Sequence, residues 1–148
     1  LLGFSEGELS VDVKEGKVYV SLSNKLLFRS GSIEVDPKGK TALDKLAVAL
    51  SSNKDIYVMI EGHTDTDKLL GQSAIKDNWD LSVLRATSIV RILTKDNRLD
   101  PKRVTPAGRG EYMPVSTNKT TEGKGKNRRT EIIITPDLGE LFQLLEAN

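Results

Sequence analysis

Two short segments of the chain hold the side chains best suited to bind a ligand. Asp65 follows a short apolar run of strand length, and Asn78, Leu81 and Arg85 lie near the start of an amphipathic stretch at 79–95. Side chains that follow a strand and side chains that open the next helix meet at one edge of an open α/β sheet. A carboxylate and a guanidinium placed there suit a zwitterion, such as the free end of an amino acid.

Each of these residues also has a purely structural interpretation. Asp65 could end a turn, Arg85 could be a solvated surface arginine, and Asn78 could cap the helix, which is its simpler role. Arg85, however, lies beside the apolar stripe that contains Leu81 and Ala86, so its stem can lie along the protein. The amides at the helix start would add attraction for an anion, and the ligand interpretation is therefore favoured.

Several kinds of chemistry are excluded or weakened by composition. The chain has no cysteine and one histidine, His63, which excludes a disulfide framework and a metal site with several histidines. No serine or cysteine in a nucleophile elbow accompanies His63, so we expect a packed or locally hydrogen-bonded histidine. Asp65 and Asp67 could suggest an acid/base pair, but Asp67 is more simply a solubilising charge. An enzyme that uses Asp65 and His63 stays as an alternative. We expect a protein that is not an enzyme and that carries no cofactor and no metal.

The segment 119–129 is basic and offers a second alternative, nucleic-acid binding. Its cationic residues are Lys119, Lys124, Lys126, Arg128 and Arg129. No aromatic residues are interleaved with them, and the formal net charge of the chain is only +1. We therefore expect no nucleic acid among the partners.

The hydrophobic pattern predicts alternating strands and helices. The predicted elements are a hairpin at 9–13 and 18–22, a helix at 37–50, a strand at 56–60, a helix at 79–95, a strand at 103–107, a strand at 129–135 and a short helix after 136. The second hairpin strand is expected to run on through 25–28, the strand at 56–60 to be buried on both faces, and 108–126 to be a loop. This order predicts an α+β fold, with helices packed on one face of a mixed β-sheet.

The length of 148 residues predicts one domain, 1–148. Its core is expected at 18–135, with a hairpin strand within 1–17 and an added helix within 136–148. No apolar run approaches the roughly 20 residues of a membrane span. Because the chain begins at Leu1, we expect that a membrane anchor or companion domain precedes it in the whole protein.

Taken in order, these segments resemble the OmpA-like peptidoglycan-binding domain, which outer-membrane protein A, peptidoglycan-associated lipoproteins and the MotB stator protein share. The resemblance covers about 18 to 134. It rests on the segments Phe28–Ser32, Ile60–Asp65, Asn78–Ser82, Arg85–Ala86, Gly108–Glu111 with Pro114, and Asn127–Glu131.

The resemblance implies a β/α/β/α/β-type sandwich that binds peptidoglycan non-covalently through the diaminopimelate of its stem peptide. It implies that Asp65 meets the ammonium and Arg85 the carboxylate of that residue. The positions that line or shape the pocket are then Thr64, Asn78 and Leu81, with Arg129 near it. A periplasmic protein that anchors an envelope component to the wall is expected, with a cell-wall hydrolase as the alternative.

Two features depart from the family pattern. The loop 66–77 is longer than usual and contains Leu69, Leu70 and Ile75, so it is either a lid over the pocket or a surface insertion. The residues after Thr135 extend past the core, and they are expected to form a packed tail helix or a homodimer contact.

Overall fold

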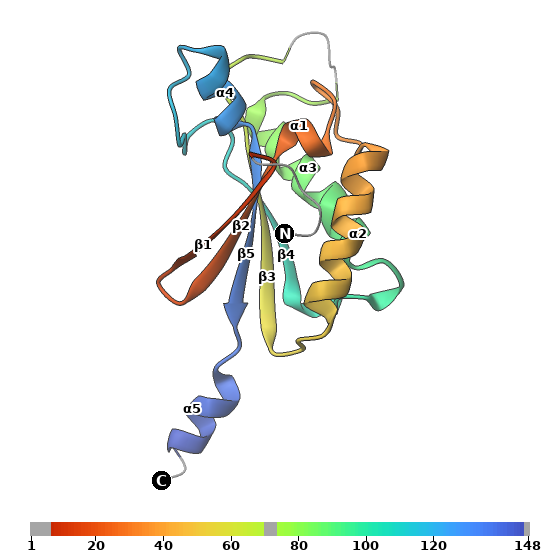
Figure 1. Ribbon diagram of the computed structural model, residues 1–148, viewed down its shortest axis with the longest axis vertical. Helices are drawn as coiled ribbons and strands as arrows, with labels where there is room; N and C mark the ends of the chain where they lie inside the picture. The colour runs from red at the N-terminus through yellow and green to blue at the C-terminus, as the bar shows by residue number, and fades with distance from the viewer. Residues whose placement is uncertain (1–6, 70–73, 147–148) are drawn as a thin grey trace.

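The computed structural model describes residues 7–69 and 74–146, which form a five-stranded sheet with helices on one face (Figure 1). The strands are β1 (Leu9–Lys14), β2 (Lys17–Ser23), β3 (Ile56–His63), β4 (Val104–Gly108) and β5 (Arg129–Pro136). Their order in the sheet is β1-β2-β5-β3-β4. Only β3 and β4 pair in parallel, and the other neighbours are antiparallel. The predicted mixed sheet of an α+β fold is confirmed.

The predicted hairpin is present and turns where the sequence indicates. Glu15 and Gly16 both have positive φ, 52° and 77°, which is the backbone of the tight turn that suits twisted antiparallel strands. The expected continuation of β2 through 25–28 is wrong. The Ser23 side chain accepts a hydrogen bond from the backbone N–H of Lys25 and starts a short helix, α1 (Asn24–Leu27).

The core lies between the sheet and two long helices, α2 (Pro37–Ser51) and α3 (Asn78–Leu93). Alternate residues of the central strands face these helices, and the helices present apolar residues at three- and four-residue spacing. The innermost side chains are Leu22, Leu27, Leu43, Ile60, Ile89, Leu93 and Ile132. As predicted, α2 starts with Pro37 directly after Asp36.

No helix of the described residues covers the other face of the sheet (Figure 1). Tyr57 and Met59 on β3 are 47% and 38% exposed, so the prediction that this strand is buried on both faces is wrong. A strand covered on one side only alternates between core and solvent, and Ile56, Val58 and Ile60 face the core. The predicted loop 108–126 also contains a helix, α4 (Thr121–Asn127). Its two glycines lower the helix propensity of this segment, which is why a loop was predicted. The Thr120 side chain nevertheless caps the helix by accepting a hydrogen bond from the Gly123 N–H.

Two glycines allow α3 to approach the sheet closely. Gly62 on β3 and Gly108 on β4 are partners in the parallel ladder. A Cβ on Gly62 would lie 2.2 Å from the backbone oxygen of Ser82, and one on Gly108 would lie 2.6 Å from its Oγ. The first turns of α3 therefore rest on strand backbone, and this contact fixes Leu81 and Arg85 relative to the end of β3.

The final helix, α5 (Gly139–Glu146), leaves the end of β5 and extends away from the sheet (Figure 1). Phe142, Leu144 and Leu145 on this helix are exposed, as is Leu138 just before it, so these four apolar side chains are not packed into the core. The added helix is confirmed, but the expectation that it packs against the core is wrong for these side chains. Within the described ranges, no helix has the length and apolar character needed to cross a membrane.

Candidate ligand-binding pocket

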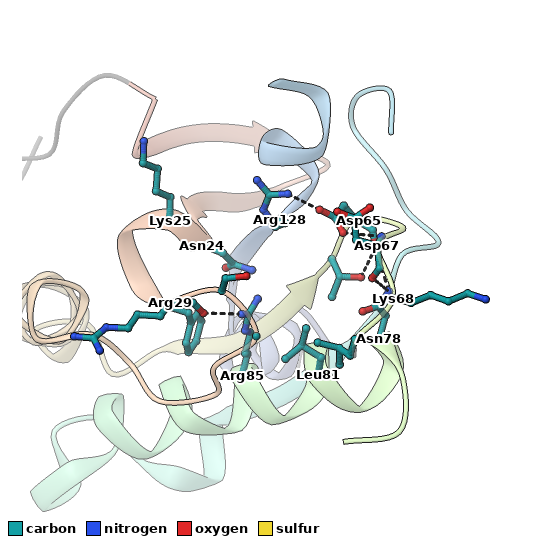
Figure 2. A pocket seen from close by; sticks show the side chains of 15 residues that line it. Asn24, Lys25, Arg29, Asp65, Asp67, Lys68, Asn78, Leu81, Arg85 and Arg128 are labelled. Carbon is teal, nitrogen blue, oxygen red and sulfur yellow. Dashed lines mark hydrogen bonds and ion pairs between the residues drawn. The ribbon is translucent and has the colours of Figure 1, made fainter. Parts of the chain in front are cut away.

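A cavity of about 600 Å³ opens where β3 ends, between α1, the start of α3 and the C-terminal end of α4. It brings together five residues that the sequence analysis singled out. These are Thr64, Asp65, Asn78, Leu81 and Arg85. Figure 2 shows Arg85 and Leu81 rising from α3 on one side and Asp65 on the loop after β3 on another.

Asp65 is held in a defined position. Its side chain accepts a hydrogen bond of 2.9 Å from the Asp67 N–H. Its backbone oxygen accepts from the Thr64 hydroxyl at 2.8 Å and from the Asn78 side-chain amide at 3.2 Å. Asn78 therefore ties down the pocket loop. The expectation that Asn78 caps α3 is wrong. The cap is Asp77, whose carboxylate accepts a hydrogen bond from the N–H of Asp80.

The Asp65 carboxylate already has a cationic partner, Arg128, which follows α4 and precedes β5. The two side chains form an ion pair, and Asp65 is only 5% exposed. A second ion pair joins Lys124 to Asp67 with 2.9 Å between Nζ and Oδ1. The end of α4 is thus attached at two points to the loop after β3, and it forms one wall of the pocket.

Arg85 is buried, with 5% exposure, and is fixed without any carboxylate partner in the described part of the chain. Its Nε donates to the carbonyl of Ser32 at 2.7 Å, and its Nη2 donates to the carbonyl of Arg29 at 3.2 Å. The guanidinium carbon lies 4.8 Å from the centre of the Phe28 ring. No described residue accepts a hydrogen bond from Nη1, so this end of the fork is available to a ligand.

The electrostatics of the pocket favour an anionic ligand group. The pKa of Arg85 is lowered to about 10, chiefly by burial and secondly by repulsion from Arg128, while the charge of Asp65 opposes this lowering. Arg85 nevertheless keeps its charge at neutral pH. The ionisable lining consists of five cations, Lys25, Arg29, Lys68, Arg85 and Arg128, against the carboxylates Asp65 and Asp67. Five minus two leaves a formal excess of three positive charges.

Arg129, which was expected near the pocket, does not line it. Its Nε donates to Glu131 Oε1 at 2.8 Å, and its Nη2 donates to the carbonyl of Met113 at 3.1 Å. Arg129 pairs with His63 across the sheet and lies on the helix-free face, whereas the preceding Arg128 reaches the pocket. Successive residues of an extended chain point in opposite directions, so only one of these two adjacent arginines enters the pocket. The sequence alone does not show which of the two it is.

The single histidine lies outside the pocket in a polar cluster. His63 is buried, and its Nε2 lies 2.8 Å from Oε1 of Glu61, whose Oε2 accepts from Arg109 Nε at 3.2 Å. The hydrogen bond with His63 lowers the pKa of Glu61, burial opposes this, and Arg109 adds to the lowering. The expectation of a locally hydrogen-bonded histidine is confirmed. Among the described residues, no group of three or more His, Cys, Asp or Glu is placed to hold a metal ion.

The loop 66–77 contributes to the pocket. Leu69 lines the cavity and Ile75 is buried, so these two apolar side chains pack against the protein, while the other described residues of the loop are exposed. Leu70, which belongs to the same predicted insertion, lies outside the described residues.

Comparisons with known proteins agree on one family. The OmpA family model matches residues 27–128, which is more than half of the chain. Motility protein B of Bacillus subtilis is 32% identical over 131 residues, covering 88% of this chain and 50% of that protein. Outer membrane protein A of Bordetella avium is 35% identical over 98 residues, covering 66% of this chain and 47% of that protein. The chain thus spans about half the length of these relatives.

Solved structures give the same answer for the fold. The cell wall anchor of the T6SS from Pseudomonas aeruginosa matches with a TM-score of 0.79 and 30% identity, covering 87% of this chain and 88% of that one. A MotB-like protein from Desulfovibrio vulgaris matches with a TM-score of 0.83 and 27% identity, covering 88% and 83%. The sheet order, the pocket and the family match all lead to one conclusion: this chain belongs to the OmpA family.

Proposed function

We propose that this chain binds peptidoglycan without covalent chemistry, through the diaminopimelate of the stem peptide, and anchors an envelope protein to the cell wall. The observation that carries the proposal is Arg85. It is a buried and immobilised guanidinium with no carboxylate partner among the described residues, and it shares one cavity with Asp65. A buried charge is costly unless it is paired, so a pocket of this kind calls for an anion from outside.

In this proposal the two charges of one amino-acid end are recognised together. The carboxylate accepts from the Nη1 end of Arg85, and the ammonium binds the carboxylate of Asp65. Hydrogen bonds to charged groups contribute roughly 1.5–3 kcal/mol each, so two of them predict a dissociation constant between about millimolar and micromolar. Many copies along a polymeric wall turn such weak binding into firm attachment.

Binding of the ammonium requires Arg128 to leave Asp65. Arg128 has a side chain that is 42% exposed, and it can move toward solvent at little cost. Ion pairs that reach the solvent contribute about 0–1 kcal/mol, which is less than a desolvated ammonium–carboxylate contact contributes. The resident pair therefore keeps Asp65 neutralised until a ligand arrives.

Peptidoglycan binding places the chain in the periplasm. Residues 1–148 act as one binding module in this proposal, and the remainder of the protein supplies its attachment to a membrane. The similarity to outer membrane protein A of Bordetella avium and to the cell wall anchor of the T6SS from Pseudomonas aeruginosa supports this arrangement.

The two alternatives receive less support from the side chains. A hydrolase that used Asp65 and His63 would need both in one site, but Asp65 is paired with Arg128, and His63 is buried outside the pocket beside Glu61. A nucleic-acid site would need exposed cations in the segment 119–129. There Lys126 pairs with Glu122, and Arg129 with Glu131, so most of that positive charge is already balanced within the protein.

Calorimetric titration with a soluble stem tripeptide tests the proposal. A peptide with meso-diaminopimelate should bind, and the same peptide with lysine, which lacks the second carboxylate, should bind more weakly. Asp65→Asn should remove binding of the diaminopimelate peptide. The same Asp→Asn change at the half-buried Asp44, which likewise removes the charge of a carboxylate paired with an arginine, is the matched control and should leave binding intact. Equal binding of the two peptides would refute the proposal, and release of soluble fragments from purified sacculi would establish the hydrolase instead.

A further inference from the structure

A second cavity lies on the helix-free face of the sheet and adjoins the pocket described above. It has a volume of about 690 Å³ and lies over β1, β2 and β5, next to α4. We call it the hairpin groove, and the residues used below are Ser10, Ser21, Lys25, Lys126, Arg128 and Glu131. Its size is in the range of sites that hold small ligands, roughly 300–1,000 Å³.

The floor of the hairpin groove carries hydroxyl groups in register. Ser10 on β1 lies opposite Ser21 on β2, and Ser21 lies opposite Glu131 on β5. Among the described residues, neither serine hydroxyl has a hydrogen-bond partner. Each hydroxyl can both donate and accept, and the carboxylate of Glu131 adds further acceptor capacity. The floor therefore matches a ligand that itself carries many hydroxyl groups.

The charges around the floor are mostly balanced. Lys14 pairs with Asp12 at 3.5 Å and Lys126 with Glu122 at 3.7 Å, and Glu131 pairs with Arg129. A neutral wall gives no advantage to a polyanion. It suits an uncharged polar group such as a saccharide.

The ridge between the two cavities is cationic. Lys25 and Arg128 line both of them. Lys25 forms no ion pair with any described residue, and Arg128 becomes available when a ligand ammonium takes its place on Asp65. A carboxylate that crosses from one cavity to the other would meet both cations.

We propose that the hairpin groove is a second subsite, which binds the saccharide of the same peptidoglycan strand. This inference rests on the proposed function. In a stem peptide, a glutamate with a free carboxylate and one alanine separate diaminopimelate from the sugar. Two residues span roughly 7 Å, and the γ-linkage of the glutamate adds two carbons to this span, so a strand whose diaminopimelate fills the first pocket can place its sugar in the adjoining groove. Three successive parts of the ligand then match three adjoining parts of the surface. The zwitterionic end binds in the pocket, the glutamate carboxylate on the cationic ridge and the neutral sugar in the hairpin groove.

The test compares two soluble ligands by calorimetry on the chain. One is the tripeptide L-alanyl-γ-D-glutamyl-meso-diaminopimelate, and the other is the same tripeptide joined to its disaccharide. Two added hydrogen bonds predict that the disaccharide ligand binds about tenfold more tightly. Ser21→Glu should remove this gain and leave the affinity for the tripeptide unchanged. Ser10→Glu, at an exposed position on the neighbouring strand, should do the same and serves as the second variant.

The control is Thr135→Glu, which places the same charge on the same face of the sheet, outside the hairpin groove. It should bind both ligands as the parent chain does. Equal affinity of the parent chain for the two ligands would overturn the second subsite and leave the proposed function standing. So would a gain that persists in both serine variants. Failure of the parent chain to bind either ligand would overturn the proposed function and this inference together.

Discussion

Replacing Arg85 with glutamine separates recognition of a carboxylate from support of the fold. The guanidinium has two duties: Nε and Nη2 hold the carbonyls of Ser32 and Arg29, and the side chain lines the cavity, with no acceptor for Nη1 among the described residues. Glutamine keeps one donor for a carbonyl and removes the charge. Loss of a charge-assisted bond of roughly 1.5–3 kcal/mol corresponds to about a 10- to 150-fold loss of affinity for a free carboxylate.

The effect on stability should be much smaller than the effect on binding. The variant loses at least one hydrogen bond from a charged donor, worth roughly 1.5–3 kcal/mol, but it also removes a buried charge that lacks a carboxylate partner in the described structure. These contributions oppose each other. We expect thermal unfolding to shift by only a few degrees, which corresponds to about 1 kcal/mol for a chain of this size.

The assay is a double-mutant cycle carried out by calorimetry. The ligands are a diaminopimelate tripeptide with a free side-chain carboxylate and the same peptide with a carboxamide there. The parent chain should prefer the free carboxylate by about 10- to 150-fold, and Arg85→Gln should bind the two ligands equally. Arg91→Gln, the same change at an exposed position on the same helix, should keep the full preference. A glutamine variant that retains the parent preference would refute the assignment of the carboxylate to Arg85.

Three further predictions concern positions around the pocket. Gly62→Ala should destabilise the chain by about 1–3 kcal/mol or more in denaturant unfolding, since its Cβ would lie 2.2 Å from the backbone oxygen of Ser82, and an unchanged midpoint would contradict that packing. Arg128→Gln should raise affinity for free meso-diaminopimelate, which lacks the glutamate, by up to about fivefold in calorimetry, because it removes the competing cation, whereas weaker binding would mean that Arg128 contacts the ligand. The pKa of Glu61 is lowered from 4.5 through His63, so its stabilising contribution is present above pH 4.5 and is lost as the pH falls through the folded-state pKa. Thermal unfolding should show a loss of stability below pH 4.5 that Glu61→Gln reduces, and an identical pH profile for that variant would contradict the assignment.

The site was predictable where local chain order decides position. Asp65 ends a strand and Arg85 lies in the first turns of the next helix, and these two elements meet at one edge of the sheet. The hairpin, the start of α2 and the core stripes follow from turn chemistry and periodicity in the same way. No long-range contact has to be known for any of these features.

The wrong predictions depend on tertiary contacts. Exposure of Tyr57 and Met59 depends on whether a second layer covers the sheet, which a run of five apolar residues does not reveal. The α4 helix contains Gly123 and Gly125, which are poor helix formers, yet a Cβ on Gly123 would lie 1.9 Å from the backbone oxygen of Thr117. Close packing against Thr117 therefore requires glycine at position 123. The same residue lowers the helix propensity of the segment, which is why the sequence did not predict the helix.

The choice of Arg128 over Arg129 connects fold to function. Both belong to the basic segment 119–129. Four cations of that segment form ion pairs with carboxylates of the described structure: Lys124, Lys126, Arg128 and Arg129. Folding thereby neutralises most of the charge of the most basic segment. Arg85 does not belong to that segment, and it remains a buried cation without a carboxylate partner among the described residues. Low-dielectric walls strengthen the field of an uncompensated charge, whereas surface pairs are screened. If the proposed function holds, selectivity for a carboxylate depends less on how many arginines the chain has than on which one the fold leaves without a carboxylate partner.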